Sequence, residues 1–372
     1  MKLPVREALK EREAPTYVDN FYPIDCALGH NPYGFPETIK KVFEGDILNA
    51  DFGKYYSFEN LLGLTLGIVS FLEGTSTSAE QIFLSNGGIG ALNTIFFKLL
   101  KPTGMLGVGP QFSHAIKNFL LTGGIYSSVP LNLWDEENIF PMNALSDEII
   151  NSNGKYSCLY LDNPNNPLGA HFSLDQLKEL VELAQKHNLF VLVDEVYADF
   201  LPNSFSVLNL VNQYENLICV RSFSKAWGLA SIRCGYLVVN PSLSLTCRKV
   251  CDPFTPSYLS AKIAAAALED NMFFKTMIPA LVKNKKRMCE IFQENKYTIL
   301  PSHPKIPIFC IYRKGANVIE ELRNLQIHVE SGKCFSSTRE DFGHEFARVR
   351  IVSKKEDLEQ LSFRLETISR SF

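Results

Sequence analysis

The segment Leu217–Gly235, LICVRSFSKAWGLASIRCG, decides how the rest of the chain is interpreted. It begins with an apolar run typical of a buried strand and continues into a loop that carries Ser222, Ser224, Lys225 and Arg233. Small hydrogen-bond donors and cations that follow a buried strand suit the binding of a phosphate beside a reactive amine. Lys225 is therefore a candidate nucleophile, although a surface lysine after a strand would give the same pattern.

Composition and charge limit the kinds of protein that this chain can be. Its 372 residues suffice for two or three domains of about 150 residues each. With 46% hydrophobic and 21% charged residues, the composition is that of a globular protein with a large core. A net charge of -3 without a basic stripe makes nucleic acids and membrane surfaces poor partners.

Targeting and metal-binding patterns are not evident in the sequence. The start, MKLPVREALKEREAP, is too charged for a signal peptide, and no uninterrupted apolar run reaches about 18 residues, so we expect a cytoplasmic protein. The nine cysteines are scattered without a CxxC pair, so we expect neither a metal site nor a disulfide framework.

Strand and helix patterns alternate along the chain from Ile82 onward. A helical pattern at 89–100 follows the first strand, and a second helix begins at Ser173 with a capping box completed by Gln176. The predicted strands are 82–84, 105–109, 157–161, 189–193 and 217–220. This order predicts an α/β fold, a mostly parallel sheet wound with helices.

The predicted strands end in residues that can meet at one site, because ligands of open α/β sheets bind at the carboxyl ends of the strands. Asp194 ends one strand, and its burial would be costly unless it met a cation or a donor, such as a protonated pyridine nitrogen. Asn166 and Tyr197 can donate to a phenolate oxygen on the same ring. Five groups can donate to a phosphate: Ser222, Ser224, Arg233 and the amides of Gly88 and Ile89. This inventory implies pyridoxal 5′-phosphate.

Five motifs resemble those of the fold-type I pyridoxal-phosphate-dependent aminotransferases, especially the histidinol-phosphate aminotransferase and threonine-phosphate decarboxylase branch. They are NPNNPLG (163–169), VLVDEVYADF (191–200), SFSKAWGLASIRCGY (222–236), NPYG (31–34) and KYY (54–56). The resemblance spans almost the whole chain. The change of pattern after Asn240-Pro241, to a long helix followed by short strands, predicts three parts: residues 1–48 as an N-terminal arm and part of the small domain, 49–241 as the large cofactor-binding domain, and 242–372 as a small C-terminal α+β domain.

The resemblance also implies a role for each site residue. Lys225 forms a Schiff base with the cofactor and is catalytic with Asp194 and Tyr197, while Asn166 and Tyr197 contact the ring oxygen and Phe112 stacks on the ring. The implied phosphate ligands are Gly88, Ile89, Ser222, Ser224, Arg233 and, from the neighbouring subunit of a homodimer, Tyr55. The implied substrate-binding residues are Asn31, Tyr33, Glu330 and Arg348, which would bind the α-carboxylate, with Arg350 as its rival.

Departures from the family pattern bear on the substrate. Ile89 replaces a polar residue of the phosphate-binding turn, so only its amide can serve there. Glu330 stands where the phosphate-substrate branch has an arginine, and its charge would repel a phosphate dianion and attract a cation. We therefore expect a donor with a positive or neutral distal group. A shift of this loop by one or two residues would instead make Glu330 a solvated acid.

The expected function is transfer of an amino group between an amino acid, or a similar amine, and a 2-oxo acid through Lys225. One alternative is decarboxylation of an amino-acid phosphate on the same cofactor. A second alternative is a non-catalytic binding or regulatory protein on the same fold, although the chain offers neither room nor basic charge for a DNA-binding domain. Because Arg348 and Arg350 alternate along a predicted strand, only one of them can face the site.

Overall fold

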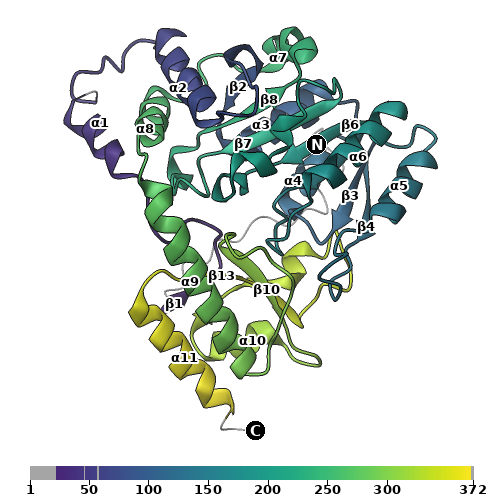
Figure 1. Ribbon diagram of the computed structural model, residues 1–372, viewed down its shortest axis with the longest axis vertical. Coiled ribbons are helices and arrows are strands. Elements are labelled where there is room, and N and C mark those ends of the chain that lie inside the picture. The colour runs from purple at the N-terminus through teal and green to yellow at the C-terminus, as the bar shows by residue number, and fades with distance from the viewer. Residues whose placement is uncertain (1–21, 46, 57, 370–372) are drawn as a thin grey trace, which may run out of the picture.

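The computed structural model describes residues 22–45, 47–56 and 58–369, which form a large upper domain and a smaller lower one (Figure 1). Residues 1–21 of the predicted N-terminal arm lie outside the described residues. Within the described part of the chain, no helix combines the length and the apolar character that a membrane crossing requires.

The large domain is built on a seven-stranded sheet with the order β2-β8-β7-β6-β5-β3-β4. Neighbouring strands are parallel except around β8, which runs antiparallel to both β2 and β7. The strands are β2 (Ile82–Ser85), β3 (Gly104–Gly109), β4 (Ile125–Pro130), β5 (Cys158–Asp162), β6 (Phe190–Asp194), β7 (Leu217–Ser222) and β8 (Gly235–Val239). The α/β fold expected from the alternating pattern is confirmed.

Helices cover both faces of this sheet, so the side chains that alternate along each strand enter two different cores. Leu159 and Leu161 of β5 pack in the core with α2, α5, α6 and α8, whereas Cys158 and Tyr160 pack in the core with α3, α4 and α7. The helices are α1 (Lys40–Glu44), α2 (Phe58–Phe71), α3 (Gly87–Thr94), α4 (Ser113–Leu120), α5 (Met142–Ile150), α6 (Leu174–Lys186), α7 (Ser244–Val250) and α8 (Tyr258–Leu268). Burial on both faces explains why the central strands are mostly apolar up to their carboxyl ends.

The small domain pairs an antiparallel sheet, of order β12-β13-β10-β9, with the long helix α9. A short parallel pair, β1 with β11, adds the chain near residue 24 to this domain. The elements are β1 (Ile24–Asp25), α9 (Phe273–Glu294), β9 (Thr298–Ile299), β10 (Ile308–Tyr312), α10 (Val318–Asn324), β11 (Ile327–His328), β12 (Glu330–Ser331), β13 (Phe346–Arg350) and α11 (Lys355–Ser369).

The boundary between the domains lies later than residue 241, where we expected it from the sequence. Helices α7 and α8 follow that residue, yet both lie on the large domain (Figure 1). Ala261 and Ala264 of α8 share a buried cluster with Leu64 and Ile68 of α2. The chain enters the small domain only with α9. A helical pattern by itself does not say which domain the helix packs against, and so the sequence placed this boundary too early.

Lys285 is a buried lysine on α9 whose amine is hydrogen-bonded to a loop of the small domain. Its Nζ lies 2.6 Å from Ser302 Oγ and 2.8, 2.8 and 3.0 Å from the carbonyl oxygens of His303, Ile306 and Ile308, and its three N–H groups are shared among these four acceptors. Buried oxygen atoms need such partners because water cannot reach them. Lys285 therefore fixes the course of residues 302–308.

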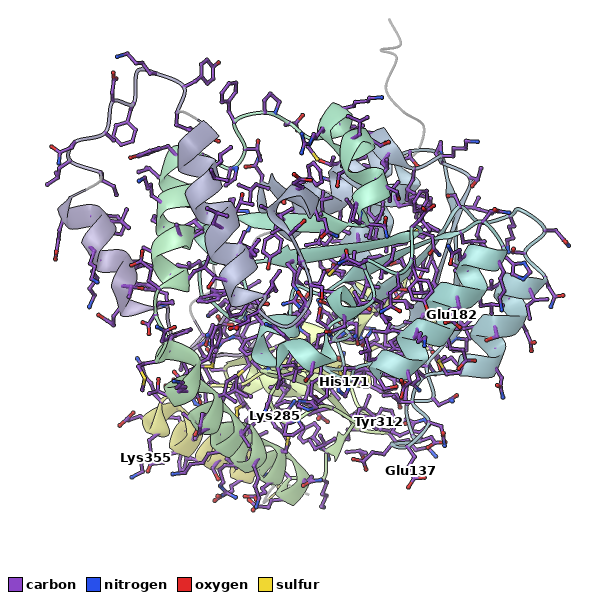
Figure 2. The ribbon with its side chains drawn as sticks, turned by 45° about the horizontal axis from the view of Figure 1, so that its top comes forward. Glu137, His171, Glu182, Lys285, Tyr312 and Lys355 are labelled. Atoms are coloured by element: carbon purple, nitrogen blue, oxygen red, sulfur yellow. The ribbon has the colours of Figure 1, made fainter. Side chains whose placement is uncertain are left out.

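The same loop contacts the large domain. The His303 amide donates to the carbonyl oxygen of Gly169 at 2.9 Å, and the His303 ring lies 5.0 Å from the ring of His171. Figure 2 shows Lys285 and His171 at the junction of the two domains. Gly169 ends the segment Asn163–Gly169, hereafter the NPNNPLG loop. Lys285 thus supports the surface on which the NPNNPLG loop rests.

We predict that Lys285→Met lowers the free energy of unfolding by about 3 kcal/mol, because the oxygen atoms of residues 302, 303, 306 and 308 lose the amine as a donor, and two of these contacts are fully buried. Urea denaturation followed by circular dichroism measures the loss. Lys286→Met is the matched control, since Lys286 is exposed on the next position of the same helix. Equal stability of the two variants would show that the Lys285 hydrogen bonds do not stabilise the junction.

Candidate active site

Two buried carboxylates mark the carboxyl edge of the large sheet. Asp162 and Asp194 are the last residues of β5 and β6, and they are register partners in this parallel pair. Each is almost fully buried, which is unusual for aspartate unless it is hydrogen-bonded. Their surroundings show what each carboxylate does.

Asp194 accepts two hydrogen bonds in the structure. The Tyr160 hydroxyl donates to Oδ2 at 3.1 Å, and the Val196 amide donates to Oδ1 at 3.2 Å. Burial raises the pKa of Asp194 to about 6, although both hydrogen bonds and the charge of Lys225 act in the opposite direction. Asp194 is therefore a buried carboxylate that a cationic partner would stabilise in its charged form.

Asp162 binds the segments that carry two of the predicted site residues. Its Oδ2 accepts from the Phe112 amide at 3.0 Å and from the Asn166 amide at 2.9 Å, and its Oδ1 accepts from Asn165 Nδ2 at 3.0 Å. Burial raises the pKa of Asp162 to about 7, and the charge of Asp194 raises it further against these hydrogen bonds. One carboxylate thus fixes the N-terminus of α4 and the NPNNPLG loop together.

The hydroxyl groups after β7 form a compact set of donors. Ser222 Oγ lies 2.9 Å from Ser224 Oγ, and Arg233 Nη1 donates to Ser224 Oγ at 3.3 Å. Arg233 has a positive φ of 52°, a left-handed conformation that is uncommon for a residue with a side chain. This turn places its guanidinium beside the hydroxyl groups.

The N-terminus of α3 faces the same donors. Gly87 has a φ of +74°, and a Cβ there would lie 2.6 Å from Arg233 Nη2. A Cβ on Gly88 would lie 2.7 Å from Val196 Cγ1 and 3.6 Å from Ser222 Cβ. Glycine at both positions therefore allows the helix to approach the serine and arginine donors closely. Amides at a helix N-terminus add to the attraction for an anion.

Lys225 lies in the turn after β7, half-buried, with its Nζ 5.3 Å from the centre of the Tyr197 ring. Tyr197 is buried and donates from its hydroxyl to the carbonyl oxygen of Gly29 at 3.3 Å. A Cβ on Gly29 would lie 2.1 Å from that hydroxyl and 3.5 Å from Lys225 Nζ. The absence of a side chain at Gly29 therefore keeps the space around the amine open.

Asn31 and Tyr33 support this region from the N-terminal segment. Asn31 Nδ2 donates to the carbonyl oxygen of Ala226 at 2.7 Å, and Asn31 Oδ1 accepts from the Tyr33 amide at 2.9 Å. Ala226 follows Lys225 directly, so the Asn31 side chain fixes the turn that carries the amine. Tyr33 packs against the buried cluster of the small domain, and burial raises its pKa to about 12.

Arg348 on β13 joins the small domain to the NPNNPLG loop. Its Nη1 donates to Asn166 Oδ1 at 3.0 Å, and its Nη2 donates to the carbonyl oxygen of Ala27 and to Glu330 Oε2, the latter at 3.2 Å. Arg350 points to the other side of the strand, where it donates to the carbonyl oxygens of Asp25 and Ile351. Of the two rival arginines, Arg348 is the one that faces the site.

The remaining predicted residues divide into two groups. Phe112 lies at the start of α4 near the carboxylates, whereas Tyr55 lies away from them, 82% exposed, with its ring 4.6 Å from that of Phe254. Ile89 is half-buried and packs against the core beneath α3. The structure thus brings together the predicted residues of one chain except for Tyr55.

The assembled residues fit pyridoxal phosphate. A buried carboxylate, a lysine amine and a cluster of hydroxyl, guanidinium and helix N-terminal donors lie at one sheet edge. Glycine at 87 and 88 leaves room beside the donor cluster that a side chain would fill. No group of three or more histidine, cysteine, aspartate or glutamate side chains suited to a metal ion occurs among residues 22–45, 47–56 and 58–369.

Three residues of this site were not identified from the sequence: Asp162, Tyr160 and Gly29. Asp162 stands directly before the NPNNPLG loop, at the end of a predicted strand, and this position was a signal that could have found it. Tyr160 lies inside an apolar strand, where a tyrosine is most simply a core residue. Gly29 gives no sequence signal, because its importance depends on Tyr197, which is distant along the chain.

Comparisons with known proteins identify the family of this chain. The model of the family described as aminotransferase class I and II matches residues 26–365. A histidinol-phosphate aminotransferase of Thermotoga neapolitana is 29% identical over 313 residues, which cover 83% of this chain and 86% of that protein.

Two solved structures share the fold. Histidinol-phosphate aminotransferase of Sinorhizobium meliloti, in complex with pyridoxal-5'-phosphate, has a TM-score of 0.80 at 18% identity, covering 100% of this chain and 99% of its own. A tetra mutant of aspartate aminotransferase of Thermus thermophilus has a TM-score of 0.81 at 18% identity, covering 97% and 98%. Because enzymes named for different substrates resemble the chain equally, this likeness shows the fold and not the substrate.

We predict that Asp162→Asn lowers kcat on the order of 100-fold, because displacement of Phe112 and Asn166 disturbs the geometry of the site. An asparagine amide at this position would also face the Nδ2 donor of Asn165. Cofactor affinity, measured by titrating the cofactor-free protein, should fall as well. The exposed Asp175→Asn on α6 is the control, and equal behaviour of both variants would contradict this role for Asp162.

Proposed function

The chain belongs to the class I and II aminotransferases, and we propose that this pyridoxal-phosphate-dependent aminotransferase uses Lys225 as its cofactor-bonding amine and Arg348 as its carboxylate-binding residue. Its activity moves an amino group from an amino donor to a 2-oxo acid. One observation carries the proposal: Lys225, Asp194 and the Arg348–Asn166 pair converge at the carboxyl edge of one sheet.

When bound, pyridoxal phosphate supplies an aldehyde that reacts with an amine and a ring that withdraws electrons from the substrate. Asp194 would keep the ring nitrogen protonated, because a buried carboxylate is stabilised by a cationic partner. Ser222, Ser224, Arg233 and the amides at the start of α3 would bind the phosphate. Tyr197 and Asn166 would position the ring oxygen, and Phe112 would contact the face of the ring.

Proton transfer at the substrate is assigned to Lys225. Its amine must be neutral to act as a nucleophile, and after the substrate amine has replaced it, the same group can take the proton from the substrate Cα. Asn31 holds Ala226, the neighbour of Lys225, and thereby positions the amine. Arg348 would bind the substrate carboxylate, which a guanidinium can grip through two parallel hydrogen bonds.

Transamination, rather than decarboxylation of an amino-acid phosphate, is the activity supported by the relatives, which are named aminotransferases. The presence of Lys225 near Tyr197 and Asp194 also argues against the non-catalytic alternative. The identity of the donor stays a prediction: Glu330 favours a donor with a positive or neutral distal group.

We predict that Lys225→Ala abolishes transamination and removes the visible absorption band of the bound cofactor, because no amine remains to bond the aldehyde. Activity and the absorption spectrum are measured on the same sample. The exposed Lys283→Ala on α9 serves as control and should leave both unchanged. Full activity with an unchanged band in the Lys225 variant would refute the assignment.

We further propose that the protein is a homodimer whose sites are completed by Tyr55 of the neighbouring subunit. Tyr55 is turned away from the site of its own chain, which supports a role in another copy. Phe254, which packs against the Tyr55 ring, and Leu62 are exposed apolar residues, and both line a groove of about 660 Å³. An exposed apolar patch of this kind is typical of a protein interface.

Subunit complementation tests this arrangement. Tyr55→Ala should weaken cofactor binding about tenfold, since one charge-assisted hydrogen bond to phosphate is lost. At limiting cofactor, mixing this variant with Lys225→Ala should restore activity to about one quarter of the wild-type value, because half of the dimers would then contain one intact site. A mixture no more active than its separate components, or a monomer in analytical ultracentrifugation, would exclude the shared site.

A further inference from the structure

Glu330 and Arg348 form an ion pair inside the site, and each position follows from the small-domain sheet. Glu330 opens β12 and is the register partner of Arg348 on the antiparallel strand β13. Oppositely charged residues directly across a strand pair attract one another. Their side chains are 27% and 8% exposed, so water screens the 3.2 Å contact only in part.

The guanidinium of Arg348 is only partly satisfied. Nη1 is bonded to Asn166, and Nη2 is bonded to Ala27 and Glu330. Nε is buried and has no hydrogen-bond partner among the described residues. A buried donor of this kind is costly, and it points to a ligand that is bound during function.

The geometry of the guanidinium indicates which ligand can pair with the free Nε donor of Arg348. Nε and Nη2 lie on the same edge of the planar group, and a bidentate carboxylate accepts from one edge. Glu330 meets this edge through Nη2 alone, at 3.2 Å, and leaves Nε unpaired. A substrate carboxylate that bound both nitrogen atoms would therefore take the place of the Glu330 carboxylate.

We propose that Glu330 is a specificity-determining residue, a carboxylate of the protein that competes with the substrate carboxylate for Arg348. The proposal rests on the function assigned to Arg348 above. Displacement leaves Glu330 charged beside the bound substrate, so the site disfavours further negative charge on that substrate. Carboxylates consequently bind less tightly than the arginine alone would allow.

Arg350 does not relieve this competition. It lies on the opposite side of β13, where it contacts the carbonyl oxygen of Asp25, and its Nη2 is 3.9 Å from Asp25 Oδ2. Its charge is therefore directed at β1 rather than at the carboxylate that Arg348 would bind. Arg348 is shared between Glu330 and the substrate.

The test measures carboxylate affinity directly, with succinate as an unreactive probe of the holoenzyme. Isothermal titration calorimetry should give a dissociation constant about tenfold lower for Glu330→Gln than for the wild type, because the competing charge is gone. Arg348→Met should abolish succinate binding. Glu290→Gln is the matched control, since Glu290 pairs with Arg287 on the surface of α9. The affinity of this variant for succinate should equal that of the wild type.

Steady-state kinetics separates failure of this inference from failure of the proposed function. With 2-oxoglutarate and pyruvate as acceptors, Glu330→Gln should lower KM more for the dianionic 2-oxoglutarate, while kcat stays within about twofold. Glu330→Ala, with folding checked by circular dichroism, should also lower KM more for 2-oxoglutarate than for pyruvate. Unchanged succinate affinity and KM in both variants, in an enzyme that still transaminates, would overturn the role of Glu330. Succinate binding that survives Arg348→Met would overturn it too. A wild-type protein that transaminates no 2-oxo acid would instead overturn the proposed function.

Discussion

The hydrogen bond from Arg348 Nη1 to Asn166 Oδ1 is the contact on which the site depends, because it joins two domains that otherwise carry separate halves of the chemistry. Asn166 belongs to the NPNNPLG loop of the large domain, and Arg348 belongs to the sheet of the small domain. The loop is held from one side by the buried Asp162. On the other side, Gly169 of the loop accepts a hydrogen bond from the His303 amide, and His303 belongs to the segment 302–308 that Lys285 holds. These contacts help to fix the predicted substrate-binding and cofactor-binding residues relative to one another.

The charged groups of this junction differ in whether they already have an oppositely charged partner. Asp194 is buried, and a cationic partner would stabilise its charged form, whereas Arg348 already forms an ion pair with Glu330. Among the residues that the structure describes, no carboxylate is bonded to the donor cluster of Ser222, Ser224 and Arg233, which suits the binding of an anion. Each part of the site therefore has one preferred type of partner. For buried groups this preference is strong, because a low dielectric raises the free-energy cost of leaving a charge unpaired.

The sequence predicted the fold and much of the site because both depend on local pattern. The strands and the capped helix after Ser173 were placed to within a few residues, as apolar runs and a capping box are local signals. Lys225, Asp194 and Asn166 were predicted as site residues because each lies at the end of a predicted strand or in the loop after it, and the strands β5, β6 and β7 end close to these residues. The boundary at residue 241 was placed too early, because α8 packs on α2 through contacts that no local pattern records.

The sequence by itself determined the α/β class and the chemical parts: a lysine, a buried aspartate, phosphate donors and an unexpected glutamate. Apolar periodicity and residue type suffice for these, since they express preferences of single segments. Only the tertiary structure decided that Arg348 rather than Arg350 faces the site and that Asp162 ties two loops together. Only the structure, too, shows that Glu330 pairs with Arg348 across the neighbouring strands β12 and β13. These facts concern pairs of residues from different segments, and the distances between such pairs are fixed by packing of the whole fold.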